Sequence, residues 1–260
     1  MISNEMSRRG INKKIGEKEL SSERLMKTRG DLPPLYHAQV SKVFGYFFSY
    51  IQGIKADKVL FVGAGSGKEI LYFSAERKGD PLICSVDIRY NELQRYGYLS
   101  KKNNINSYAI EGDGMSLPFA DGSFDVAFAF DALHHMDDPG LCLSEMLRVS
   151  GTVCVSDRRK CALSRAARYL GIQKPDYDGL YANEINTRDV LGMTRDRGRE
   201  AIFLKHHLLT LFTFDPGITA FFQKNRTLTS LYTFLVNASN AIFGSFGNGA
   251  ICVIGRRCEQ

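Results

Sequence analysis

The sequence lacks the cysteine and histidine spacings that bind structural zinc. Its six cysteines include no C-x-x-C pair, and no histidine stands at zinc-ligand spacing from them. Cys84, Cys154 and Cys252 lie in apolar runs, where a thiol packs as a small hydrophobic side chain. This usage predicts reduced thiols and a cytoplasmic protein, in which the glycosylation sequons at Asn225 and Asn237 have no role.

The sequence also lacks an apolar segment near its start and any run suited to a membrane. Residues 1–18 are polar and basic without an apolar centre, which argues against a signal peptide. The stretch 227–255 contains no charged residue, but Thr, Ser, Asn and Gly interrupt its apolarity. We therefore expect no membrane span. Internal repeats and low-complexity tracts are absent as well.

What is present fits one large domain with additions. A chain of 260 residues that is 44% hydrophobic has ample material for a core. The net charge of +6 permits an anionic partner, such as a phosphate-bearing substrate, RNA or a membrane surface, without requiring one.

Residues 58–70 predict a buried strand, a glycine turn and the start of a helix. The apolar run 59–62 is too short for a helix and suits a strand covered on both faces. Gly63, Gly65 and Gly67 permit backbone conformations that a Cβ excludes, so a ligand can press against the turn. The helix adds free N–H groups and a positive dipole end. The stretch therefore predicts a nucleotide-type binding turn.

Strand-like runs alternate with helical patterns along the chain, which predicts a parallel, doubly wound α/β sheet with right-handed crossovers. The expected strands are 59–62, 81–87, 107–110, 124–130, 152–156, 201–208 and 250–255. The expected helices include 68–78, 91–103, 140–149 and 187–198. A helix that packs on the sheet is also expected around residues 40–51, where six apolar side chains recur at helical spacing; a lid over the ligand is the alternative.

The glycine turn does not match a dinucleotide fingerprint, because the sixth position holds Lys68 instead of glycine. Lys68 also lacks the spacing and the following Ser or Thr of a P-loop. Asp87 ends the second strand about 20 residues on, where a carboxylate accepts both hydroxyls of a ribose. Asp113 follows the third strand. Ligands of such sheets bind outside the carboxyl ends of the strands, so the turn and both carboxylates are expected to converge there.

These residues, together with the sequence L-P-F-x-D-x-S-F-D at 117–125, resemble class I S-adenosylmethionine-dependent methyltransferases. The nearest resemblance is to the subfamily that includes ubiquinone/menaquinone-biosynthesis methyltransferases. Leu133-His134-His135 and Glu145 with Arg148 fit the same pattern, and the resemblance covers residues 58–157. It implies a Rossmann-like, doubly wound, mostly parallel seven-stranded sheet with helices on both faces and an antiparallel last strand.

The resemblance also implies a binding site for S-adenosylmethionine. In it, Asp87 binds the ribose hydroxyls, Asp113 binds the adenine amino group, and backbone near Phe130 approaches the methionyl amino group. The implied cofactor-binding residues are Gly63, Ala64, Gly65, Gly67, Asp87, Ile88, Asp113, Gly114, Met115, Phe130 and Asp131.

One position departs from the family pattern. The family usually carries an acidic residue where this chain has Phe61, and that carboxylate helps to orient the turn and the amino end of the cofactor. Glu69 and Asp131 are candidates to replace it.

The candidate catalytic residues, Asp131, His134 and His135, lie on the loop after the fourth strand. A general base is needed only where the accepting atom carries a proton of high pKa. Alternatively, the histidines cap or pack against the following helix. We expect no metal, because Asp137 and Asp138 suit the acidic start of a helix better than a metal site.

The methyl acceptor is expected to be small or apolar, and methylated on oxygen or carbon. The chain lacks the Asn/Asp-Pro-Pro-aromatic and Pro-Cys motifs of nucleic-acid methylases, so nucleic acid is disfavoured. The aromatic segment 211–246 predicts either extra core or a wall for an apolar or lipid-linked acceptor, and the basic residues between 158 and 168 either hold an anionic head group or are solvated. A non-catalytic binding or partner module and an NAD-dependent oxidoreductase are the alternatives. The oligomeric state is left open.

We expect three regions along the chain. Residues 1–30 form a flexible basic segment, and residues 31–157 form the cofactor-binding half of the methyltransferase domain. Residues 158–260 supply the substrate-side decoration and the last two strands of the same domain.

Overall fold

The computed structural model describes residues 34–54, 56–77, 79–171, 183–207, 227–231, 234, 238 and 249–256. The predicted basic segment 1–30 and most of the aromatic segment 211–246 lie outside the described residues. Within the part that is described, no helix combines the length and the apolarity needed to cross a bilayer.

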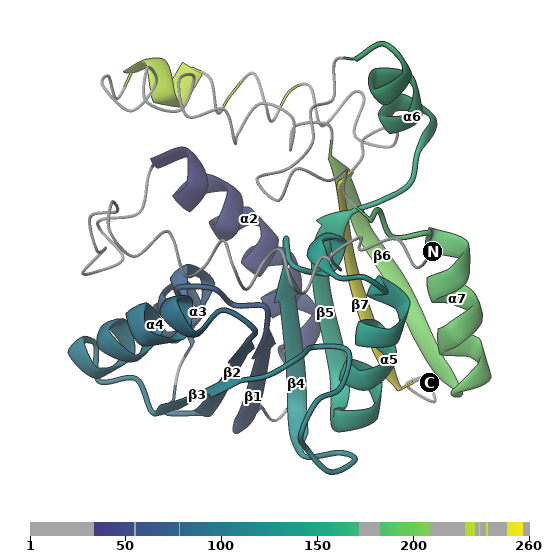
Figure 1. Ribbon diagram of the computed structural model, residues 1–260. Helices are drawn as coiled ribbons and strands as arrows, with labels where there is room; N and C mark the ends of the chain where they lie inside the picture. The colour runs from purple at the N-terminus through teal and green to yellow at the C-terminus, as the bar shows by residue number, and fades with distance from the viewer. Residues whose placement is uncertain are drawn as a thin grey trace, which may run out of the picture.

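A seven-stranded sheet in the order β3-β2-β1-β4-β5-β7-β6 forms the centre of the molecule (Figure 1). Its first five strands run parallel to one another, and β7 runs antiparallel to both β5 and β6. The expected mostly parallel sheet with an antiparallel last strand is confirmed. The strands are β1 (Lys58–Val62), β2 (Leu82–Asp87), β3 (Ser107–Glu111), β4 (Phe124–Phe130), β5 (Ser150–Arg158), β6 (Arg199–His207) and β7 (Gly249–Arg256).

Strand β1 is buried on both faces because its side chains alternate between two separate cores. Leu60 and Val62 join the core beneath α5 (Pro139–Val149) and α7 (Thr187–Asp196). Val59 and Phe61 join the opposite core. The continuous apolar run in the sequence follows from this double burial.

The opposite core is covered by α2 (Pro34–Ile51) and α3 (Lys68–Glu76), with one ring from α4 (Tyr90–Lys102). The helix expected near residues 40–51 therefore packs on the sheet, and the alternative of a lid is not observed. Val40, Val43, Phe44, Phe47 and Ile51 are all buried there.

The structure corrects the predicted extent of the fifth strand. Residues 152–156 were expected, but β5 runs from Ser150 to Arg158 because antiparallel pairing with β7 continues to the pair Arg158–Gly249. The domain boundary predicted at residue 157 thus falls inside a strand. Helix α3 ends at Glu76, two residues before the predicted end.

Candidate functional site

The residues predicted to bind a ligand follow the carboxyl ends of β1 to β4, at one edge of the sheet. Backbone hydrogen bonds tie these ends together: the Gly63 N–H donates to the carbonyl of Val86 at 2.8 Å, and the Gly112 N–H donates to the carbonyl of Asp87 at 3.1 Å. The glycine turn and the first two acidic strand ends therefore converge as expected.

All three glycines of the turn have left-handed backbone, with φ of 66° at Gly63, 50° at Gly65 and 81° at Gly67. The predicted need for glycine is confirmed, but its reason differs in part. A Cβ on Gly63 would lie 2.6 Å from the Cβ of Ala132, and a Cβ on Gly67 would overlap the ring of Tyr96. The protein itself presses against the turn at these two positions.

Asp87 holds the turn from the end of β2. Its Oδ2 accepts the Gly65 N–H at 2.8 Å, its Oδ1 accepts the Arg89 N–H at 2.9 Å, and the side chain is nearly buried. A carboxylate that fixes this turn therefore comes from β2, and the candidates Glu69 and Asp131 stay predictions.

Phe61, the departure from the family pattern, is a core residue. Its ring is 1% exposed and stacks on Phe128 with centroids 5.0 Å apart, with Phe73 edge-on at 5.6 Å. The position of the usual carboxylate is therefore occupied by an aromatic ring that belongs to the core beneath α2 and α3.

The segment after β3 is a tight turn held by its own aspartate. The Oδ1 of Asp113 accepts the Met115 N–H at 2.9 Å, and its carbonyl accepts the Ser116 N–H. Gly114 is buried, and a Cβ there would lie 2.9 Å from Val62 and 2.8 Å from the terminal carbon of Met136. Packing within the protein thus explains this glycine, and the adenine contacts stay a prediction.

The L-P-F-x-D sequence is organised by Arg148 of α5. Its guanidinium donates to the carbonyls of Leu117 and Phe119 at 3.0 and 2.7 Å, and to Asp121 at 2.8 Å. It is also bonded to both oxygens of Glu145, and Glu145 in turn accepts the Leu117 N–H. The most specific motif of the sequence is therefore a scaffold that fixes the path from β3 to β4.

The loop after β4 brings together two of the candidate catalytic residues and one that sequence reasoning missed. Asp131 is a non-glycine residue with φ of 44°, and His134 lies in a short 3-10 helix, η3 (Leu133–His135). The Nδ1 of His134 lies 2.5 Å from Oδ1 of Asp157, which is 2% exposed at the end of β5. The missed signal was an acidic residue at a fifth strand end, the rule already applied to Asp87.

Burial and mutual charge give these side chains very different pKa values. Burial and the neighbouring Asp157 raise the pKa of Asp131 to about 6. Burial alone would lower the pKa of His134, but the charge of Asp157 and the hydrogen bond to it prevail, and the pKa is raised. Burial would likewise raise the pKa of Asp157, yet its bonds to His134 and to the Arg158 N–H lower it. Burial and the charge of His134 lower the pKa of His135 to about 2.

Among the described residues, Asp131, His134 and Asp157 have ligand atoms close enough together to hold a metal, within 4.8 Å of one another. Their bonding does not suit a cation. Asp157 accepts three backbone N–H groups, and the Nδ1 of His134 is also engaged with it. The metal site considered from the sequence included Asp137 and Asp138, which are not part of this cluster. Asp138 instead caps α5 by accepting the Gly140 and Leu141 N–H groups.

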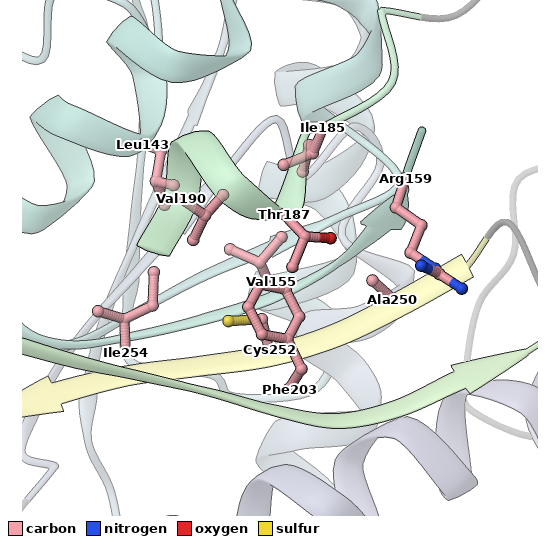
Figure 2. A pocket seen from close by; sticks show the side chains of 10 residues that line it. All are labelled: Leu143, Val155, Arg159, Ile185, Thr187, Val190, Phe203, Ala250, Cys252 and Ile254. Atoms are coloured by element: carbon pink, nitrogen blue, oxygen red, sulfur yellow. The ribbon is translucent and has the colours of Figure 1, made fainter. Parts of the chain in front are cut away.

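A small cavity lies beneath α7, where side chains of β5, β6, β7 and α7 converge (Figure 2). Its volume is about 20 Å³, which is room for about one water molecule. Its lining is largely apolar, with the Arg159 side chain at one end. This gap is too small to receive an organic acceptor.

Comparison with known proteins agrees with this geometry. A family model described as a methyltransferase domain matches residues 60–153. An O-methyltransferase of Aspergillus nomiae is 29% identical over 103 residues, which are 38% of this chain and 44% of the relative. Residues 60–153 of the chain thus form a methyltransferase domain, in agreement with the resemblance to class I S-adenosylmethionine-dependent methyltransferases. The 27-O-demethylrifamycin SV methyltransferase of Amycolatopsis mediterranei is 27% identical to this chain over 95 residues, which are 36% of the chain and 34% of the relative.

The crystal structure of the YcgJ protein from Bacillus subtilis superposes on this chain with a TM-score of 0.59 at 18% identity. The superposition covers 84% of this chain and 99% of that one, and it shows a shared fold. The matches to the two sequence relatives cover less than half of either relative's length.

Proposed function

We propose that the protein transfers a methyl group from S-adenosylmethionine to an oxygen or carbon of a small, largely apolar acceptor. The observation that carries this proposal is the convergence, at one sheet edge, of a glycine turn held by Asp87 with the Asp131–His134–Asp157 cluster. The glycine turn with Asp87 suits the binding of a nucleoside, and the Asp131–His134–Asp157 cluster suits proton transfer.

The residues around the turn fit the cofactor. A carboxylate accepts up to about four hydrogen bonds, and the Gly65 and Arg89 N–H groups take one position on each oxygen of Asp87. The guanidinium Nε of Arg89 also lies 3.5 Å from Oδ1, so the acceptor capacity left for a ribose hydroxyl is greater on Oδ2 than on Oδ1. Glycine-turn backbone and the N-terminus of α3 would receive the amino-acid end, while Asp113, Gly114 and Met115 would flank the adenine.

The bound cofactor supplies a methyl group on a positively charged sulfur. The protein must align the accepting atom with that methyl and exclude water, because orientation alone supplies several kcal/mol of the barrier reduction. In this proposal the side walls of the site come from the turn and from the loop after β4.

Asp131 is the residue best suited to take a proton from an acceptor hydroxyl. It is half-buried, and its pKa of about 6 leaves it ionised at neutral pH yet more basic than an ordinary carboxylate. His135 is a poor base, because a group with a pKa of about 2 holds a proton weakly. His134 is buried and tied to Asp157, so its role is to hold charge beside Asp131.

The acceptor class rests on the relatives and on composition. The printed names of two relatives describe an O-methyltransferase and a methyltransferase of a rifamycin derivative. The segment 211–246 is rich in aromatic residues and nearly uncharged, as a wall for an apolar molecule would be. Nucleic acid stays disfavoured, since Asp131-Ala132-Leu133-His134 replaces the motif of base-methylating enzymes.

Calorimetric titration with S-adenosylhomocysteine tests the proposal. We expect saturable binding, and Asp87→Ala should weaken it at least about tenfold, because two ribose hydroxyls lose a charged acceptor. Asp125→Asn is the control, since Asp125 accepts the Asp57 and Lys58 N–H groups at the amino end of β4. Absence of binding at millimolar ligand, or equal affinity in the Asp87 variant, would contradict the proposal.

A non-catalytic binding module is the second candidate, because Phe61 replaces the family carboxylate with a core ring. The two candidates separate in a screen with methyl-labelled cofactor against a broad small-molecule extract. A labelled product supports the enzyme. Tight S-adenosylhomocysteine binding with no labelled product supports the module.

A further inference from the structure

Asp157 accepts more hydrogen bonds than an ion pair with a histidine requires. Its Oδ2 accepts the Ala132 and Leu133 N–H groups at 3.1 and 2.7 Å. Its Oδ1 accepts the Arg158 N–H at 2.6 Å and contacts Nδ1 of His134 at 2.5 Å. One buried carboxylate is thus bonded to three consecutive residues of the loop after β4.

These bonds begin where regular sheet pairing ends. The Asp131 N–H still donates to the carbonyl of Ser156 at 2.8 Å, which continues the pairing of β4 with β5. At Asp131 the backbone turns left-handed, with φ of 44°, and the next two N–H groups point to the Asp157 side chain. A left-handed conformation is strained for a residue with a Cβ, so surrounding contacts must hold it in place.

The far side of the loop is fixed as well. Asn183, just before α7, donates its backbone N–H to the carbonyl of His134 at 3.0 Å and its side-chain amide to the carbonyl of Met136 at 2.7 Å. Ala132 lies against the glycine turn, since it fills the space beside Gly63. The position of Ala132 therefore decides whether turn and loop meet correctly.

We propose that Asp157 is a positioning residue that latches the backbone of residues 131–134 in the shape that receives the amino-acid end of the cofactor. The inference rests on the proposed function for the identity of that ligand. The latch itself is a property of the protein, and it makes no contact with the reacting atoms.

A purely structural role is the competing explanation, and Asp125 provides a matched control for it. Asp125 also accepts two backbone N–H groups of another segment through a single oxygen, at 2.9 Å each, but at the opposite end of the sheet. Asp125→Asn and Asp157→Asn should therefore both reduce stability, while only the second should alter the loop.

The first measurement is ligand selectivity. S-adenosylhomocysteine carries the amino-acid portion, and 5′-methylthioadenosine lacks it. We expect Asp157→Asn to weaken binding of the former roughly tenfold or more and to leave the affinity for the latter unchanged within about twofold. Asp125→Asn should change neither. Equal losses for both ligands, or no loss for either, would overturn the latch.

The second measurement needs no ligand. Amide hydrogen exchange of the wild-type protein should be slow at Ala132 and Leu133, and Asp157→Asn should accelerate it there without accelerating it in β4. Fast exchange at both amides of the wild type overturns the proposal, even if the variant fails to fold. Failure of the wild type to bind S-adenosylhomocysteine would refute the proposed function, while exchange would still decide the latch.

Discussion

His134 and His135 are adjacent in sequence, with ring centroids 4.0 Å apart, yet their pKa values are shifted in opposite directions. The Asp157 carboxylate raises the pKa of His134, whereas burial and the charge of His134 lower the pKa of His135 to about 2. The carboxylate bonded to the ring of His134 and the burial of the ring of His135 explain the opposite shifts. The surroundings of each ring, and not its place in the sequence, therefore set its pKa.

The lowered pKa of His135 makes a stability prediction. Between pH 6.5 and about 2, the unfolded chain binds a proton at His135 and the folded protein does not. This residue therefore reduces the stability of the fold as the pH falls through that range. At pH 5 the effect is about 2 kcal/mol. We expect the unfolding free energy of the wild type, measured with urea, to fall between pH 7.5 and pH 5. In His135→Phe the fall should be smaller by about 2 kcal/mol. Equal losses in both proteins would contradict the shift.

Residue identities at the site were largely predictable, because acidic residues at strand ends and the loop after β4 can be located from the sequence. Asp157 was missed because its strand was expected to end at Ser156, and the extra length comes from pairing with β7, almost a hundred residues away. The holding of the turn by Asp87 also depends on a bond between neighbouring strands that the chain does not display locally.

At the scale of elements, the connection from the glycine turn into α3 depends on close packing against α4. Gly67 precedes α3 with φ of 81°, and a Cβ there would overlap the ring of Tyr96, which is itself buried. Helix α4 thus limits how the first turn of α3 can approach the ligand.

Gly67→Ala is therefore expected to destabilise the protein by about 2 kcal/mol or more, because left-handed backbone with a Cβ costs about 1–3 kcal/mol before any displacement of Tyr96. Its affinity for S-adenosylhomocysteine should fall as well. Gly53→Ala is the control, since a Cβ at Gly53 meets nothing within 4 Å and the backbone is not left-handed. Urea unfolding and calorimetry check both, and similar stability of the two variants would refute this account.

Most elements were predictable from apolar periodicity, and their ends were less so. The strand expected at 124–130 is β4 as observed, since its apolar run is bounded by a turn at Asp121-Gly122. The role of Arg148 was not predictable, because its partners Leu117 and Phe119 lie about thirty residues away and are reached through backbone carbonyls.

In the whole molecule, α2 contributes to the core as fully as any strand. Phe44 is wholly buried and its ring meets those of Phe47, Tyr72 and Phe130 within 6.3 Å. The helix precedes the residues matched by the family model, which begin at residue 60, but it is part of the same packing unit.

Phe44→Ala should therefore destabilise the whole domain by about 3–5 kcal/mol, through lost burial and the cavity left behind. Tyr98→Ala, on the exposed face of α4, should cost far less. Chemical denaturation followed by circular dichroism measures both. A small loss for Phe44→Ala would mean that α2 can leave the core without unfolding the sheet.

Sheet order was predictable only through the family resemblance, because apolar runs specify strands and not their neighbours. The insertion of β7 between β5 and β6 is the clearest case, since β6 precedes it in the chain. An acceptor wall formed by residues 211–246 stays a prediction, because most of them lie outside the described residues.

The reversed direction of β7 has a practical consequence for handling the protein. Each parallel strand ends at the edge of the sheet that carries the predicted cofactor site. Strand β7 instead begins at that edge, where Gly249 pairs with Arg158. It ends at the opposite edge, where Arg256 pairs with Arg199, the first residue of β6. An affinity tag or a surface tether attached after β7 therefore leaves from the opposite edge. Immobilised in this way, the protein would present its binding edge to the solution.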